Sequence, residues 1–127
     1  MKLFDSGVLI ALFTINDEHH ESATRLASSE KKISITESTL YETVNFIFKK
    51  NGPKKAVEAL NVLIDSEVEI QNTYVNHLAK AGEIMLKYKS LSLNDAMIVA
   101  VLQDYELREV VSFDSDFDKV PSIKRIS

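Results

Sequence analysis

The sequence predicts a three-layer α/β/α fold built on a mainly parallel central sheet of about five strands. Short segments with strand character alternate with longer segments whose apolar residues recur at helical spacing. This alternation is typical of parallel strands joined by helices that cover both faces of the sheet. The chain has 127 residues, of which 45% are apolar and 27% charged, and neither a repeat nor a linker-like stretch divides it. We therefore expect residues 1–127 to form one domain.

The expected strands are short and rich in β-branched and aromatic residues. Two helices, over 7–14 and 18–29, are expected between the first strand and the second. The five strand segments are 2–4, 32–35, 67–70, 109–113 and 123–126.

A helical hairpin is expected between the second strand and the third, over about 37–66. Its first helix has an apolar stripe that begins at Leu40 and ends at Phe48. Gly52 followed by Pro53 is typical of one helix ending and the next beginning. Because this hairpin places long apolar helices on a small domain, we expect the protein to form a homodimer.

Two further helices are expected before the fourth strand. The first extends over about 75–86, and the second, over 95–105, is apolar almost all round and should be buried. The apolar runs are much shorter than the roughly 18 to 20 residues that span a bilayer, so we expect no membrane contact. The absence of cysteine suits a reducing compartment, and we expect a cytoplasmic protein.

The charge balance directs attention to carboxylates. Lys and Arg number 15 and Asp and Glu 19, and the net charge of −4 argues against a protein that mainly coats nucleic acid. If four carboxylates belonged to one metal site, the remaining charges would balance. Without cysteine there is no thiolate ligand and no thiol nucleophile, so oxygen ligands are the expected chemistry.

Acidic residues follow the expected strands at the edge where ligands bind in parallel sheets. Asp5 comes directly after the first strand, and Asp114 and Asp116 come after the fourth. Glu42 lies in the first turns of the hairpin, and Asp95 begins the buried helix. These five side chains are therefore expected near one edge.

Each acid also has a local explanation. Thr39 with Glu42 and Ser92 with Asp95 fit the spacing of a helix capping box, and the other acids suit turns. However, Asp5 and Asp95 both precede apolar runs and have no adjacent Lys or Arg. Carboxylates held in such surroundings require a counter-charge, and oxygen ligands select Mg²⁺ or Mn²⁺. Such ions promote hydrolysis of phosphate esters.

The acids lie in four short motifs, which are Asp5, Thr39-Leu-Tyr-Glu42, Leu93-Asn-Asp-Ala96 and Ser112-Phe-Asp-Ser-Asp-Phe117. Together these motifs resemble those of the PIN-domain ribonucleases, and the element order over essentially the whole chain is similar to that of VapC-type toxins of toxin–antitoxin pairs. The resemblance implies a PIN-like fold and a Mg²⁺- or Mn²⁺-dependent endoribonuclease. It also implies RNA as substrate and a cognate antitoxin as partner.

The same resemblance implies roles for individual residues. The catalytic and metal-binding acids would be Asp5, Glu42, Asp95 and Asp114, with Asp116 as an accessory metal-binding acid. Ser112 would position ligands or water, and Ser6 and Asn94 are candidates to orient a carboxylate. Gly7 departs from the pattern, because family members often carry Asn or Ser there and gain a hydrogen bond near the metal.

Other readings remain open. The basic stretch Lys49, Lys50, Lys54 and Lys55 either contacts RNA phosphates or is a solvated helix end. His77 lies beside the apolar stripe of its helix and is expected to be a boundary residue. A phosphoacceptor signalling domain fits poorly, because the third strand ends in Ile70-Gln-Asn-Thr without the required acid. An RNA-processing nuclease that is not a toxin and a PIN-like interaction module without activity both stay possible readings.

Overall fold

Every strand of the central sheet runs parallel to its neighbours. The computed structural model describes residues 1–127, and its sheet has the order β3-β2-β1-β4-β5. The predicted mainly parallel, five-stranded sheet is therefore confirmed, although each strand is shorter than its predicted segment. The strands are β1 Leu3–Phe4, β2 Ser34–Thr36, β3 Glu69–Gln71, β4 Glu109–Val111 and β5 Lys124–Ile126.

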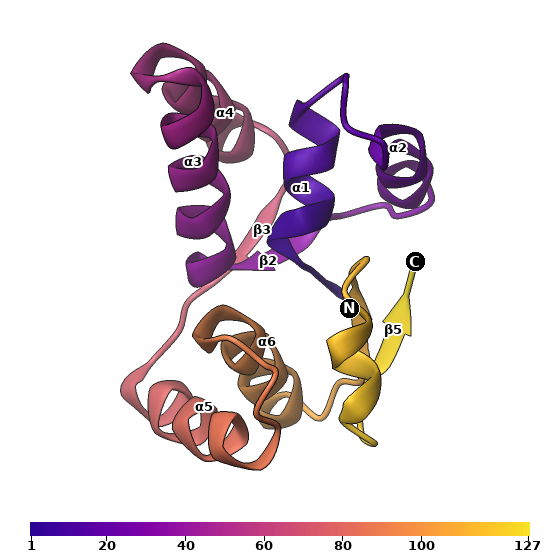
Figure 1. Ribbon diagram of the computed structural model, residues 1–127, viewed down its shortest axis with the longest axis vertical. Coiled ribbons are helices and arrows are strands. Elements are labelled where there is room, and N and C mark those ends of the chain that lie inside the picture. The colour runs from indigo at the N-terminus through magenta and orange to yellow at the C-terminus, as the bar shows by residue number, and fades with distance from the viewer.

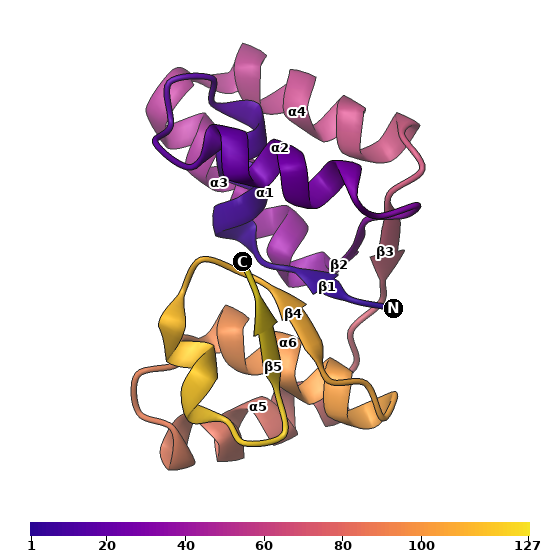
Figure 2. The same ribbon diagram turned by 90° about the vertical axis from the view of Figure 1, so that its right-hand side faces the viewer.

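Helices cover both faces of this sheet (Figures 1 and 2). The first four lie on one side, and the last two lie on the other. A 3-10 helix, η1, replaces the turn expected before the last strand. The helices are α1 Ser6–Phe13, α2 His20–Ser28, α3 Glu37–Asn51, α4 Pro53–Asp65, α5 Val75–Lys87, α6 Leu93–Asp104 and η1 Ser115–Lys119. None of them is long and apolar enough to cross a membrane.

Alternate strand residues fill two separate cores. Leu3 and Val110 belong to the apolar cluster under α5 and α6, whereas Phe4 and Val111 belong to the cluster under α1 to α4. Because successive side chains of a strand point to opposite faces, two residues of each central strand are enough to join both layers to the sheet. As predicted, α6 is buried along most of its length.

The predicted hairpin is present and turns at Gly52. This glycine has φ +87°, a conformation that side-chain-bearing residues rarely adopt, and it ends α3 while Pro53 begins α4. The predicted apolar stripe of α3 needs one correction. Phe48 is 52% exposed, and Thr43 takes its place on the buried face with Leu40 and Ile47.

The predicted capping box of α3 is wrong. Thr36, the last residue of β2, caps the helix and accepts a hydrogen bond from the Thr39 N–H. Because the strand leads directly into the helix, α3 starts three residues earlier than the Thr39 box requires. Glu42 therefore does not cap the helix and lies in its second turn.

The prediction that His77 is a boundary residue is wrong. Its side chain is buried and only 2% exposed. Its Nδ1 accepts the Tyr74 N–H at the start of α5, and its Nε2 lies 2.9 Å from a carboxylate oxygen of Asp104 in α6. The ring is buried because it joins the two helices and satisfies a free backbone N–H at a helix end.

Candidate functional site

Asp5, the first of the predicted acids along the chain, lies where the strand order reverses. The chain proceeds from β1 outward to β3 and then returns to β4 beside β1, and parallel sheets bind ligands at the carboxyl ends of two such strands. Asp5 follows β1, and its N–H donates to the Val111 carbonyl of β4 at 2.9 Å. The Ser112 hydroxyl donates to Asp5 Oδ2 at 2.8 Å. Ser112, which follows β4, thus holds the carboxylate of Asp5, which follows β1.

Glu42 reaches the same place from α3. The hydroxyl of Ser6, in the first turn of α1, donates to Glu42 Oε1. This contact joins residues that are 36 positions apart. The structure therefore gives Ser6 the predicted geometry for orienting a carboxylate, and the carboxylate that it contacts is Glu42.

Asp95 has the predicted capping geometry and also faces the other acids. Its carboxylate accepts the Ser92 N–H at 3.1 Å, and its own N–H donates to the Ser92 hydroxyl at 3.3 Å. Burial raises the pKa of Asp95, the hydrogen bonds from Ser92 lower it, and the charges of Asp114 and Glu42 raise it further. Capping and membership of the acidic group are compatible.

Burial raises the pKa of Asp5 to about 6. The Ser112 hydroxyl and the Ser6 N–H oppose this increase by donating hydrogen bonds, whereas the charges of Asp95 and Glu42 add to it. The structure thus brings together the four acids Asp5, Glu42, Asp95 and Asp114, which lie on four segments distant in sequence. We call these four residues the acidic group.

Asp114 and Asp116 differ in their surroundings. The Asp114 N–H donates to the Ser112 hydroxyl at 3.0 Å, and its Oδ1 accepts the Asp116 N–H at 2.9 Å. The Asp116 carboxylate forms an ion pair with Lys119 at 3.1 Å. None of the ion pairs in the structure involves a member of the acidic group.

The residues around the acidic group fit a divalent cation chemically. All donors are oxygens, and the buried Oδ1 of Asn94 has no hydrogen-bond partner, while its Nδ2 contacts the Thr39 hydroxyl at 3.4 Å. In the side-chain arrangement described, no three acidic or histidine residues are close enough to hold one ion. The carboxylates of Asp5, Glu42, Asp95 and Asp114 each accept a hydrogen bond from the protein instead.

The predicted basic stretch and Gly7 lie outside the acidic group. Lys49 and Lys50 end α3, and Lys54 and Lys55 begin α4, at the tip of the hairpin. Lys49 lies seven positions after Glu42 on the same helix, which is about 10 Å along the axis. At Gly7 an added Cβ would meet nothing within 4 Å, so packing does not require glycine there.

Sequence reasoning missed Arg125, which lies beside the acidic group. Its Nη1 donates to the Ser112 carbonyl at 3.3 Å, and its Nε and Nη2 donate to the two carboxylate oxygens of Asp118. The available signal was an arginine on the last strand, because β5 pairs in parallel with β4 and brings this residue next to Ser112.

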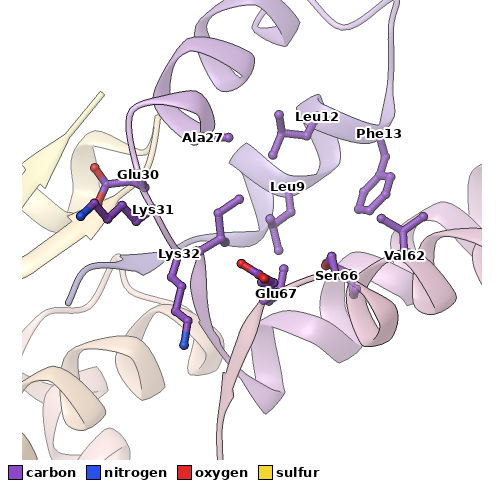
Figure 3. Close-up of a pocket in the computed structure, with 13 residues that line it drawn as sticks. Leu9, Leu12, Phe13, Ala27, Glu30, Lys31, Lys32, Val62, Ser66 and Glu67 are labelled. Carbon is purple, nitrogen blue, oxygen red and sulfur yellow. The ribbon is translucent and has the colours of Figure 1, made fainter.

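An apolar groove of about 340 Å³ lies elsewhere, between α1, α2 and α4 (Figure 3). Leu9, Leu12 and Phe13 line it from α1, and Val62 lines it from α4. Charged side chains, including those of Glu30 and Lys32, stand at its rim, and no member of the acidic group contributes to it.

The fold and the acidic group together define the PIN-like class of α/β/α domains that the sequence predicts. A model of the PIN domain matches residues 2–123, and the chain belongs to this family.

Two curated relatives share 28% of their aligned residues with this chain. Ribonuclease VapC13 of Mycobacterium tuberculosis aligns over 100% of both chains. Ribonuclease VapC6 of Methanocaldococcus jannaschii aligns over 96% of this chain and 94% of the relative.

Solved structures have the same fold at lower sequence identity. VapC20 of M. tuberculosis, described as a toxin that cleaves the sarcin-ricin loop, superposes with a TM-score of 0.85, 22% identity and 94% coverage of both chains. A toxin–antitoxin complex from Klebsiella pneumoniae gives a TM-score of 0.73 and 22% identity, over 100% of this chain and 97% of that chain.

The pKa of Asp5 predicts how the stability of the metal-free protein depends on pH. Its value of about 6, against 3.8 ordinarily, means that the native state holds a proton longer than the unfolded state. Asp5 therefore contributes stability below about pH 4 that is lost as the pH rises through 6, about 3 kcal/mol in total. Asp5→Asn removes this loss, so the variant should gain stability over the parent between pH 4 and pH 7.

Urea unfolding in EDTA at both pH values measures this difference. Asp65→Asn, which changes an exposed acid at the end of α4, is the matched control. An Asp5→Asn protein whose stability relative to the parent is the same at pH 4 and pH 7 would contradict the assignment.

Proposed function

We propose that this chain is a Mg²⁺- or Mn²⁺-dependent endoribonuclease and the toxin of a toxin–antitoxin pair. The observation that carries the proposal is the acidic group, in which four carboxylates without ion-pair partners lie at the carboxyl edge of a PIN fold. The names of the curated relatives, which are ribonucleases, support the reaction. The structural neighbours that are toxins, or complexes of toxin with antitoxin, support the biological role.

In this proposal Asp5, Glu42, Asp95 and Asp114 hold the metal and face the scissile phosphodiester. When bound, Mg²⁺ or Mn²⁺ supplies a nucleophilic water at neutral pH and stabilises the leaving oxygen. Ser112 keeps Asp5 oriented through its 2.8 Å hydrogen bond, and Ser6 does the same for Glu42. The hydrogen bond from Ser112 lowers the pKa of Asp5 and so favours its ionised, ligating form.

Asn94 and Asp116 have supporting roles. The buried, unpartnered Oδ1 of Asn94 would accept a hydrogen bond from a water molecule within the site. Asp116 joins the site by leaving Lys119, since their ion pair is partly exposed and therefore weak. The lysines at the tip of the hairpin would contact RNA phosphates remote from the cleaved bond.

The variant Asp95→Asn distinguishes a role of Asp95 as a metal ligand in the acidic group from a role in helix capping alone. Asparagine still accepts the Ser92 N–H but lowers the charge of the group. RNA cleavage should fall by more than about 100-fold, because even indirect support of a metal ligand is typically worth 10–100-fold. The metal-free melting temperature at pH 7 should stay equal or rise, because a buried charge is removed.

The measurement uses cleavage of an RNA panel in Mg²⁺ or Mn²⁺, with EDTA and Ca²⁺ as inactive conditions, since Ca²⁺ coordination is too flexible to place the water. Glu83→Gln, an exposed acid on α5, is the control. Parental cleavage by Asp95→Asn would rule out its role as a ligand. A parent that binds Mn²⁺ but cuts no RNA would favour the interaction module.

We propose that an antitoxin binds the groove between α1, α2 and α4 through an apolar segment. Its apolar lining and charged rim suit such a segment better than they suit RNA. Several structural neighbours are toxin–antitoxin complexes or VapBC assemblies, which supports a protein partner. From the groove, an extension carrying a basic side chain would reach the acidic group and replace the metal there.

Two valines of α4 test the groove. Val62 lines it and is 53% exposed, whereas Val57 is 52% exposed and lies outside it. When the tagged chain is expressed with its flanking reading frames, Val62→Asp should lose a co-purifying small protein that Val57→Asp retains, because the aspartate puts a charge into the apolar contact. Equal recovery with both variants would contradict this docking site.

We also propose a homodimer formed through exposed apolar residues of α3 and α5. Glu37 accepts hydrogen bonds from the Tyr41 hydroxyl and the Thr73 N–H, so the start of α5 lies beside α3. Tyr41, Val75 and Leu78 are all exposed. An unpartnered apolar surface of this kind on a small domain marks an interaction site.

Sedimentation at about 100 µM should show a dimer, a concentration at which a micromolar interface is largely occupied. Leu78→Glu should give a monomer, because it buries a charge in the proposed contact, and Val57→Glu should remain dimeric. A parent that is monomeric at this concentration would overturn the proposal.

A further inference from the structure

The segment after β4 carries three acids within five residues, and the structure pairs two of them with cations. Asp116 pairs with Lys119, and Asp118 pairs with Arg125 through two hydrogen bonds of 3.0 and 3.1 Å. Asp114, the member of the acidic group, has no ion-pair partner. Both nearby cations are therefore paired with acids outside the acidic group.

Arg125 is close enough to Asp114 to disturb this distribution. Its Nη1 contacts the carbonyl of Ser112, and the Ser112 hydroxyl accepts the N–H of Asp114. The charge of Asp114 is one of the influences that raise the pKa of Arg125, although the hydrogen bonds with Asp118 contribute most. Arg125 therefore has two carboxylates within its electrostatic reach and is held by one of them.

The geometry of the pair with Asp118 explains why Arg125 stays there. A guanidinium presents parallel N–H groups that match a carboxylate, and a two-bond pair fixes its orientation as well as its place. With Nε and Nη2 engaged by Asp118 and Nη1 by a backbone carbonyl, the guanidinium forms no ion pair with Asp114. The same pairing lowers the pKa of Asp118, which keeps that carboxylate ionised.

We propose that Asp118 is a positioning residue, whose pairing with Arg125 prevents this arginine from neutralising Asp114 and so preserves the affinity of the site for a divalent cation. The inference rests on the proposed metal site. Without Asp118, the guanidinium would turn toward the nearest remaining carboxylate, Asp114, and compete there with the metal. Neither Asp118 nor Arg125 would touch the metal or the RNA.

Single and double substitutions of Asp118 and Arg125 test this role. Asp118→Asn should weaken Mn²⁺ binding by roughly tenfold, the lower range for residues that act through a metal ligand. Arg125→Gln should bind Mn²⁺ with an affinity equal to that of the parent or up to about threefold higher, because the competing cation is gone. The double variant should behave like Arg125→Gln, so that the second substitution restores what the first one lost.

Electron paramagnetic resonance of free Mn²⁺ gives the affinities, and melting in EDTA shows that each variant is folded. Glu83→Gln changes the net charge as Asp118→Asn does, and Arg108→Gln removes an exposed arginine just before β4, at the opposite edge of the sheet. Both controls should bind Mn²⁺ as the parent does. If Asp118→Asn fails to fold, Arg125→Gln alone still distinguishes the readings.

If the pair of Asp118 and Arg125 only stabilised the segment after β4, the variants would behave differently. Arg125→Gln would then weaken Mn²⁺ binding as much as Asp118→Asn, and the double variant would be no better than either, which would overturn the inference. Parental affinity in Asp118→Asn would overturn it as well, while leaving the proposed function intact. A parent that binds no Mn²⁺ would overturn both the metal site and this inference.

Discussion

Four carboxylates held together at one end of a sheet without ion-pair partners are the constraint on which the rest of the site depends. Their mutual repulsion and partial burial act against folding, as the raised pKa values of Asp5 and Asp95 show. Hydrogen bonds from Ser112 and Ser92 fix two of these carboxylates in place without cancelling their charge. The arrangement is stable only because the surrounding fold contributes enough free energy to hold it.

Part of that free energy comes from the capping of two helices by members of the acidic group. Asp5 caps α1, and Asp95 closes a capping box on α6, so each carboxylate lies at the positive end of a helix dipole. The helices themselves are anchored by the two apolar clusters, which the alternating residues of β1 and β4 connect through the sheet. The same residues thus begin the helices and form the acidic group, and local capping offsets part of the repulsion.

The sequence was sufficient to predict the sheet, the layers and the convergence of the acids, because these follow from periodicity and from the rule that carboxyl ends share an edge. It was insufficient where a choice depended on distant residues. Whether Thr36 or Thr39 caps α3 depends on where β2 ends, and the burial of His77 depends on Asp104, 27 positions away. Arg125 was missed because its importance arises only from the pairing of β5 with β4. Metal binding by the predicted site residues stays a prediction.

Helix α1 relates the groove to the acidic group. It begins at Ser6, beside Asp5 and Glu42, and its last turns contribute Leu12 and Phe13 to the groove. An α-helix of eight residues is about 12 Å long, a distance that about four residues of extended chain cover. A segment seated in the groove therefore needs only a short extension to bring a side chain to the carboxylates. Because those carboxylates have no ion-pair partners, a lysine or arginine arriving there would be attracted by uncompensated charge, and by occupying the site it would exclude the metal.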